Sequence, residues 1–368
     1  MPTRSAHLCY RGNVLEETIV NADTHAGGVG ARARPGVRLH RAAIALILVV
    51  VGAVQAAPDA ARAAVDTSAR TAAEIRAKWQ LLRPTYGGGP YALLPRSKAP
   101  YAAGALRTSF LNDGLKMLRY CRYVAGLPYG VGLYAKYVSY AQHASVLDAA
   151  WGRLDHTPAR PVGMSLSFYQ LGYKGTSSSN LAAGFPDLES TVLAYMRDSD
   201  TTNIDRVGHR RWILSPLMAR TGMGYANGFS ATYAFDRSGS TPGWKLIRWP
   251  CAGWFPLPLM GGSTTAWSVS LNPAKYRLAP QQITVRLRRL SDGGVWTFDS
   301  GDTDRVGAYL AVNTDSYGYA PCIIFRPEPG SISYRRGAQY EVTIRGGVFT
   351  VASGAPVTIR YRTRFLSL

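Results

Sequence analysis

The chain has 368 residues, a hydrophobic content of 46%, and a formal net charge of +20 from 42 Lys and Arg against 22 Asp and Glu. This length exceeds one typical domain, and the hydrophobic content excludes a mostly disordered protein. The basic residues are scattered and form no run interleaved with aromatic side chains. The sequence therefore predicts a surface that attracts anionic partners, but no specific nucleic-acid site.

The N-terminal region has the features of a secretory signal peptide. Arginines precede an uninterrupted apolar run at 42–54, and the Val-Gln-Ala sequence at 54–56 supplies small residues for a cleavage site. The apolar run is too short to span a membrane comfortably. Because it lies deep in the chain, we hypothesise that residues 1–36 are an over-extended reading frame. We interpret 1–57 as this extension plus a signal peptide, with an uncleaved signal anchor as the alternative.

Export would place the mature protein outside the cell or in the cell envelope, with no stable transmembrane span after processing. Oxidising conditions in those compartments allow disulfides. Cys121 lies on the apolar face of a predicted helix and is expected to be a buried thiol. Cys251 and Cys322 could form a pair, which the sequence alone does not establish.

Residues 58–101 are predicted to form a helix followed by an irregular linker. The helix lies in an Ala-rich stretch, can be capped by Asp66 or Thr67, and ends at Pro84. The Gly-Gly-Gly-Pro sequence at 87–90 then indicates the irregular part.

Residues 102–240 show three helical patterns. Apolar residues recur at steps of three and four from Leu111 to Cys121 and again from Tyr137 to Leu154, and a third helix is expected to begin after Asp187. Strand-like segments are predicted at 212–214 and 225–235. We therefore expect helices that flank a small sheet.

The C-terminal part changes to a period of two. After a Trp- and Pro-rich connection at 241–265, apolar and polar residues alternate in segments such as 283–288, 340–345 and 357–362. Short alternating strands separated by turns favour a β-sandwich. Residues 266–368 are accordingly predicted to form an independent, all-β, sandwich-like domain.

Four motifs occur in order along the helical part. They are the Gly-Arg-Leu-Asp-His-Thr-Pro sequence at 152–158, Ser-Asn-Leu-Ala at 179–182, Val-Gly-His-Arg-Arg-Trp-Ile-Leu at 207–214, and Thr-Gly-Met-Gly at 221–224. Together they resemble the CAP superfamily, also called SCP or PR-1-like domains, of the bacterial secreted type. The resemblance covers roughly 106–236. It implies an α+β fold class, with a three-layer αβα sandwich ahead of the predicted β-sandwich.

In typical CAP domains two His and two Glu converge on an open cleft. The resemblance matches His156 and His209 to the two histidines, whereas Ser179 replaces the first glutamate and Asp198 could supply a shortened carboxylate. Both imidazoles are expected to line one solvent-accessible groove beside Asp198. Asn180 belongs to the same set of cleft candidates and is expected to close a turn.

The chemistry of this set leaves three interpretations open. Two imidazoles and one carboxylate suit a zinc ion with an open coordination position, so His156 and His209 are candidate metal ligands and Zn²⁺ is the candidate cofactor. The same residues could shuttle protons near neutral pH. Alternatively, both histidines are structural and hold the loops around the cleft.

The favoured function is a secreted, non-catalytic CAP-domain protein that binds a lipid, an envelope polymer or a protein in a His-lined cleft. CAP proteins as a group are associated with extracellular binding roles and share no single reaction, and the replaced glutamate favours this interpretation. The alternative is a metal-assisted hydrolase acting on envelope peptide or glycan. It needs His156, His209 and Asp198 within reach of one metal ion. A third possibility is an adhesin-like or scaffold role of the sandwich alone.

Overall fold

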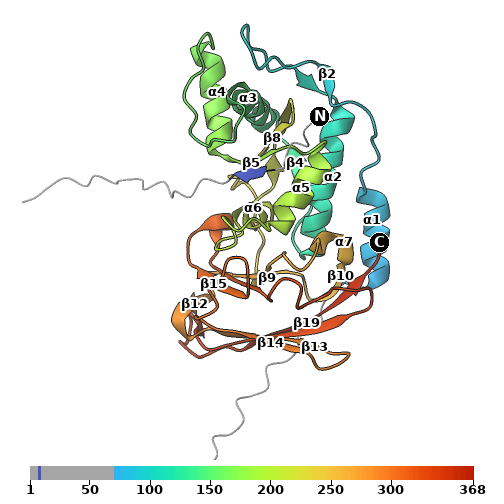
Figure 1. Cartoon of the computed structure of the whole chain (residues 1–368), viewed down its shortest axis with the longest axis vertical. Coiled ribbons are helices and arrows are strands. Elements are labelled where there is room, and N and C mark those ends of the chain that lie inside the picture. Colours follow the sequence, from blue (N-terminus) through green and yellow to red (C-terminus); the bar gives the residue numbers. More distant parts are fainter. Residues whose placement is uncertain (1–6, 10–69) are drawn as a thin grey trace, which may run out of the picture. The chain divides into compact units, whose positions relative to one another are not determined.

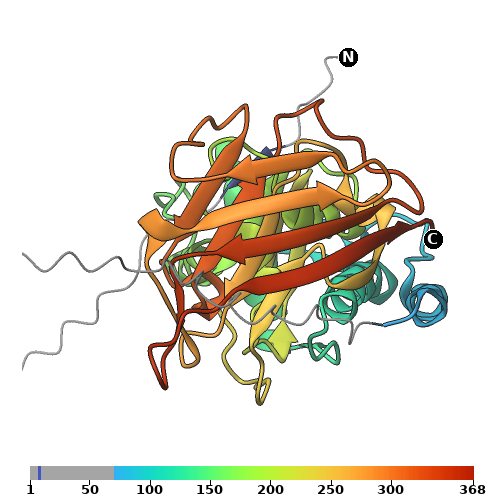
Figure 2. The same cartoon turned by 90° about the horizontal axis from the view of Figure 1, so that it is seen from below.

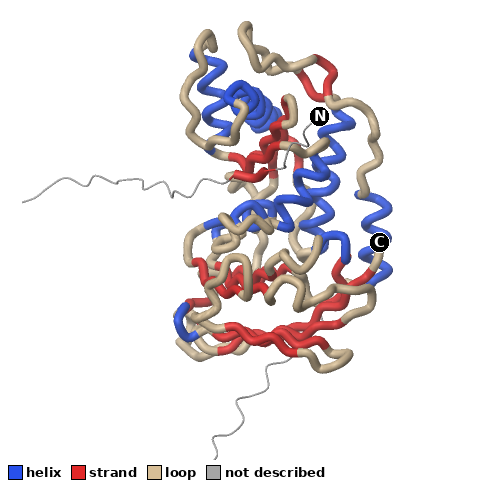
Figure 3. Tube along the Cα trace, viewed as in Figure 1, coloured by secondary structure: helices blue, strands red, loops and turns tan. Residues whose placement is uncertain are grey.

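The computed structural model describes residues 7–9 and 70–368, which form a mixed fold of helices and several sheets (Figures 1 and 3). This agrees with the α+β class predicted from the sequence. Most of the predicted N-terminal extension and signal peptide at 1–57, and the two expected helix-capping residues, Asp66 and Thr67, lie outside the described residues. Of the segment at 1–57, only residues 7–9 are described. The helices are α1 (Ala72–Leu82), α2 (Thr108–Val124), α3 (Ala135–Trp151), α4 (Leu166–Ser177), α5 (Leu188–Arg197), α6 (Gly208–Ile213) and α7 (Leu257–Met260).

The strands belong to three larger sheets and to several two-stranded pairs. In the helical part they are β1 (His7–Cys9), β2 (Tyr91–Leu93), β3 (Ala105–Leu106), β4 (Gly132–Leu133), β5 (Ser179–Ala183), β6 (Arg220–Thr221), β7 (Met223–Ala226) and β8 (Phe229–Tyr233). The remaining strands are β9 (Leu246–Trp249), β10 (Gly253–Pro256), β11 (Trp267–Leu271), β12 (Tyr276–Leu278), β13 (Thr284–Arg289), β14 (Val295–Phe298), β15 (Tyr309–Asn313), β16 (Cys322–Arg326), β17 (Gln339–Arg345), β18 (Val348–Thr350) and β19 (Ile359–Leu366).

The helix predicted in the linker is confirmed as α1, and a capping box starts it. The Thr71 hydroxyl accepts the backbone N–H of Glu74 at 3.2 Å, and the Glu74 carboxylate accepts the backbone N–H of Thr71 at 2.7 Å. Such a reciprocal pair satisfies two backbone donors that the first turn leaves open. The helix ends at Leu82, two residues before Pro84, as the sequence indicates.

The small sheet of the helical part has the strand order β1-β5-β8-β7, with antiparallel pairing throughout. The hairpin between β7 and β8 turns at Asn227 and Gly228, whose φ angles are 51° and 87°. Positive φ at both turn residues matches the right-handed twist of a hairpin and explains the Asn-Gly pair. The strand predicted within 225–235 is thus confirmed as this hairpin.

The strand predicted at 212–214 is wrong, because these residues lie at the end of α6. The helix starts after Val207, which has a left-handed φ of 41°. An apolar run of three residues has no periodicity that could separate a strand from a buried helical turn. All six residues of α6 are buried, so the polar face that would reveal a helix is absent.

Helices cover both faces of this sheet (Figure 1). On one side α3 packs on β7 and β8, and α4 packs on α3. On the other side lie α2 and α5. There the Phe110 ring packs edge-on against Tyr225, and the Tyr195 hydroxyl donates to the backbone oxygen of Asn180 at 2.9 Å.

Two glycines of the Thr-Gly-Met-Gly motif allow α3 to lie directly on the strand segment. A Cβ atom on Gly222 would come within 2.0 Å of the Tyr137 backbone, and one on Gly224 within 2.2 Å of the Ala141 carbonyl oxygen. Such distances are far below van der Waals contact, so any side chain here would force helix and strand apart. The two glycines of the motif are thus explained by the close packing of α3 on the strand.

The C-terminal strands form two sheets, with the orders β10-β19-β17-β13-β14 and β15-β16-β11-β9. Figure 2 shows red and orange strands of the five-stranded sheet running side by side. In β13, Val285 and Leu287 are buried whereas Arg286 and Arg288 are exposed, which confirms the predicted alternation. Aromatic rings join the two sheets, as between Trp267 and Phe365 with centroids 6.4 Å apart.

The domain boundaries differ from those predicted. The expected connection at 241–265 contributes β9 to one sheet and β10 to the other, so the sandwich begins at Leu246. The sequence analysis missed these two strands because the segment is rich in Trp and Pro and shows no clear alternation of apolar and polar residues. One cluster of buried apolar residues runs from Ile75 to Leu366, and 70–368 belong to a single compact unit. The sandwich therefore shares its core with the helices instead of standing alone.

Cys121, Cys251 and Cys322 are free and buried. Cys121 is the buried thiol that the helix pattern predicts, whereas Cys251 and Cys322 do not pair. Burial raises the pKa of Cys251 to about 12, which keeps this thiol protonated and unreactive. Among the described helices, none has both the length and the apolar content needed to cross a membrane.

Candidate functional site

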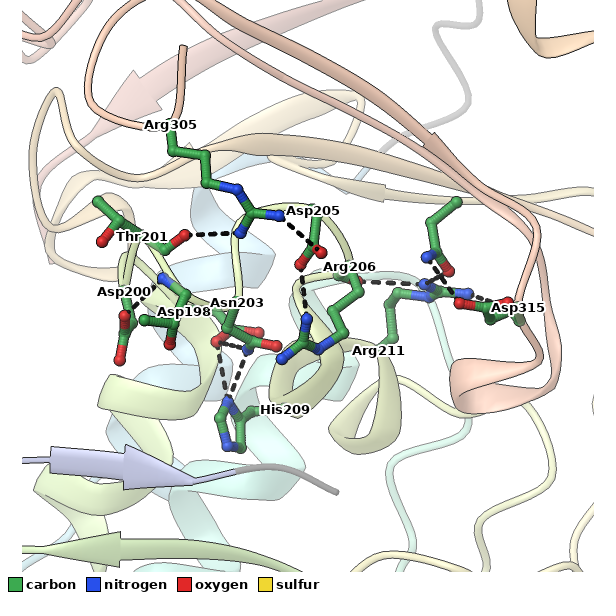
Figure 4. A network of polar contacts seen from close by, with 12 residues as sticks. Asp198, Asp200, Thr201, Asn203, Asp205, Arg206, His209, Arg211, Arg305 and Asp315 are labelled. Carbon is green, nitrogen blue, oxygen red and sulfur yellow. Dashed lines mark hydrogen bonds and ion pairs between the residues drawn. The ribbon is translucent and has the colours of Figure 1, made fainter. Parts of the chain in front are cut away.

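His209 lies in the first turn of α6 and is almost completely enclosed, with 1% of its surface exposed. Its Nδ1 atom is 2.9 Å from Oδ1 of Asp198 and 2.9 Å from Nδ2 of Asn203 (Figure 4). The ring stacks on Tyr195 with 5.3 Å between centroids. The imidazole is thus held by polar contacts at its edge and by an aromatic ring on its face.

The Asp198 carboxylate is fully buried and both of its oxygens are engaged. Oδ1 accepts from Asn203 Nδ2 at 2.5 Å and contacts His209 Nδ1, and Oδ2 accepts the backbone N–H of Arg210 at 3.2 Å. For an ionised carboxylate, the consistent assignment has His209 Nδ1–H and Asn203 Nδ2–H both donating to Oδ1. Asp198 therefore fixes the imidazole tautomer and also caps the start of α6.

His156 is placed differently. It follows α3, is 6% exposed, and its Nδ1 atom is 2.6 Å from the backbone oxygen of Thr176. The Thr176 hydroxyl donates back to the His156 carbonyl at 3.2 Å. This reciprocal pair ties the loop after α3 to the end of α4.

Ser179 and Asn180, the first two residues of the Ser-Asn-Leu-Ala motif, lie in strand β5. Ser179 is 3% exposed and pairs with Tyr233 of β8. Asn180 is fully buried, and its Nδ2 atom donates to the backbone oxygen of His209 at 2.9 Å. Asn180 therefore attaches the sheet to α6, which corrects the turn-closing role expected for it.

The structure brings Asn180, Asp198 and His209 together, and it engages His156 elsewhere. Neither imidazole lines an open groove, because both are buried. Asp198 contacts His209, as the sequence predicts. Among the described residues there is no group of three or more His, Cys, Asp and Glu arranged to hold a metal ion.

Sequence reasoning missed the role of the two arginines that follow His209. Arg210 is fully buried and donates to four backbone or side-chain oxygens of α5 and the sandwich. Two of them are the carbonyl of Ala266, at 2.8 Å, and the hydroxyl of Ser268, at 3.1 Å. Burial lowers the pKa of Arg210 to about 10, against the opposing effect of the Asp198 charge. The guanidinium remains charged at neutral pH.

Arg211 makes a second connection to the sandwich. Its Nη1 atom donates to Asn313 Oδ1 at 2.6 Å, and its Nη2 atom donates to the carbonyl of Asp315 at 2.6 Å (Figure 4). The loop before α6 is attached as well, since Arg305 pairs with Asp205 at 3.0 Å. The feature of the sequence that could have indicated these connections is the Arg-Arg pair itself, which stands directly before the apolar residues at 212–214.

One surface cleft lies at the junction of α5, α7 and the sandwich. It has a volume of about 380 Å³, and Arg197, Gly261, Ser263, Ser333 and Tyr334 are among its lining residues. No sequence motif predicts this cleft, because its lining comes from three separate segments.

A second cleft, of about 480 Å³, lies beside α2 and contains Asp113. This carboxylate already accepts the backbone N–H of Thr85 at 2.9 Å and pairs with Lys116 at 3.0 Å. Its charge is used to hold the linker against α2. The junction cleft is therefore the better candidate for a ligand.

No protein-family model, curated protein or solved structure matches this chain.

Proposed function

We propose that this chain is an exported, non-catalytic binding protein with a CAP-like three-layer helical part, whose ligand lies at the junction with the β-sandwich. The ligand is a component of the cell envelope. Helices on both faces of the small sheet and the order of the four motifs support the CAP-like assignment.

The observation that carries this proposal is the burial of the two motif histidines. His156 and His209 are 6% and 1% exposed, and each commits Nδ1 to a neighbour that holds a loop or a helix. A catalytic group must reach the atom on which it acts. The junction cleft, in contrast, is open and carries a cationic side chain, Arg197.

The experiment is co-sedimentation of the purified, exported protein with an envelope preparation at several salt concentrations. We expect binding that weakens as salt rises, because the protein carries a net charge of +20. Intact mass of the exported protein checks the export step. Material that retains Arg38 would contradict cleavage at the predicted site, and absence of sedimentation at low salt would contradict envelope binding.

The alternative, a metal-assisted hydrolase, requires His209 and Asp198 to exchange their present contacts for a metal ion. Metal analysis of the purified protein tests it directly. Stoichiometric zinc that is lost in both His156→Ala and His209→Ala would favour the hydrolase, whereas a metal-free protein with unchanged stability in EDTA favours the binding protein.

A further inference from the structure

The junction cleft is built around the side chain of Arg197, the last residue of α5. Its Nη2 atom donates to the carbonyl oxygen of Pro258 at 3.1 Å, and this is its one hydrogen bond to the described residues. The Nε atom is buried and has no acceptor among them. The guanidinium is thus held in place, and the described residues leave most of its five N–H donors unused.

The opposite wall is shaped to admit this side chain. Gly261 follows α7 and has a φ of 77°, a conformation that L side chains rarely adopt. A Cβ atom there would lie 2.6 Å from Cδ and from Nε of Arg197. Gly261 therefore serves two needs at once: the turn, and the close passage of the arginine over the backbone.

Among the described residues, no carboxylate neutralises the charge of Arg197. None of the ion pairs among the described residues includes it. The neighbouring carboxylate, Asp198, is fully buried and engaged by His209 and the backbone of Arg210. A cation held without a counter-charge beside an open cleft favours an anionic ligand.

The remaining lining is suited to a small polar molecule with a ring. Ser263 and Ser333 place polar residues on the cleft wall, and Leu257, Ile332 and Tyr334 add an apolar surface. The volume, about 380 Å³, falls in the usual range of small-molecule sites.

From these features we propose that the junction cleft binds an oxyanion, a carboxylate or a phosphate, on a sugar-sized group, with Arg197 as the main anion contact. A guanidinium matches both anions because two parallel N–H donors can face two oxygens. The proposal deepens the function proposed above and rests on it, since it names the chemical group that an envelope ligand would present.

The experiment compares three probes by calorimetric titration of the full exported protein. Glucuronate tests the carboxylate, glucose 6-phosphate tests the phosphate, and glucose is the neutral control of similar size. We expect at least one anionic probe to bind, and glucose to bind about tenfold more weakly or not at all. Arg197→Gln should weaken binding of the anionic probe by about tenfold or more, whereas Arg286→Gln, which removes an exposed charge on β13, should not.

Several results would overturn the proposal: equal binding of glucose, no binding of either anion at millimolar concentration, or unchanged binding by Arg197→Gln. If Arg197→Gln does not fold, Arg197→Lys keeps the charge without the paired donors and should bind the anionic probe with intermediate affinity.

Co-sedimentation with the envelope separates the two proposals. If Arg197→Gln sediments like the unmodified protein and also keeps its affinity for the anionic probe, envelope binding stands and the anion site fails. If the unmodified protein does not sediment, the proposed function fails.

Discussion

Arg210 donates from Nη1 to the carbonyl oxygen of Ala266 at 2.8 Å, and this bond joins helix α6 to the residue that precedes β11. The residue before it, His209, contacts Asp198 at the end of α5. The Gly-His-Arg-Arg sequence therefore acts as a connector: its imidazole holds the helical part together, and its arginines hold that part to the sandwich. One compact core follows from this arrangement.

Arg210→Met should destabilise the whole protein, not the sandwich alone. Without the guanidinium, the buried carbonyl oxygens of Met196, Arg197 and Ala266 lose a donor. Each unsatisfied buried group costs about 1–3 kcal/mol, so we expect a loss of about 3 kcal/mol or more in the free energy of unfolding. Urea unfolding measures it, and Arg286→Met is the exposed control. A loss below about 1 kcal/mol would contradict the connector role.

His209→Ala should lower the thermal midpoint and leave the response to EDTA unchanged. The variant removes a stacked, buried ring and the Nδ1 contact to Asp198. We expect a loss of about 2–4 kcal/mol, because a cavity is created and the buried Asp198 carboxylate loses one of its hydrogen-bond donors. Thermal unfolding with and without EDTA measures both quantities. If EDTA destabilises the unmodified protein but not the variant, the imidazole holds a metal and the structural role is wrong.

Local patterns in the sequence predicted many of the elements. Asp187 caps α5 by accepting the backbone N–H of Ser190 at 2.7 Å, as its place before an apolar stripe indicates. The alternation in β13 follows its burial. These predictions succeed because caps and periodicity depend on residues close in the chain.

The candidate site was predicted only in part, for a physical reason. The meeting of Asp198 and His209 was expected, but their burial depends on a loop whose course the sequence does not show. Asp198 and Val207 both have left-handed φ angles, 44° and 41°, although neither is glycine. Tertiary contacts impose that strain, and the same contacts bring Asn203 to the imidazole.

Gly224→Ala should destabilise the packing of α3 on β7. The added methyl group would meet the carbonyl oxygen of Ala141 at 2.2 Å, and this atom belongs to a helix backbone that cannot move alone. Overpacking of this kind costs about 1–3 kcal/mol. Gly130→Ala is the matched control, because nothing lies within 4 Å of its added Cβ atom. Urea unfolding of the two variants checks the prediction, and equal stabilities would refute direct helix-on-strand packing.

Asp148→Asn should stabilise the protein at neutral pH and have little effect near pH 4. Asp148 is 1% exposed in the last part of α3, and its Oδ2 atom has no partner among the described residues. Burial raises the pKa of this carboxyl well above its usual range, with a further contribution from the charge of Asp155. The folded protein therefore keeps a proton that the unfolded chain, with a pKa of about 3.9, releases.

The sign of the pH effect follows from this difference. Between the unfolded pKa and the raised folded pKa, the folded state binds more protons, so stability falls as the pH rises. Asparagine removes this dependence and keeps an oxygen that can accept the backbone N–H of Asp155. Asp292→Asn is the control, because the Arg289 side chain lowers the pKa of Asp292 to about 2. The stability that Asp292 contributes is lost only as the pH falls below about 4, so the curve of Asp292→Asn should run parallel to that of the unmodified protein from about pH 4 to pH 8. Urea unfolding is measured from about pH 4 to pH 8, and the stability of Asp148→Asn should rise with pH relative to that of the unmodified protein. If the two curves of stability against pH are parallel, the pKa of Asp148 is not raised in the folded protein.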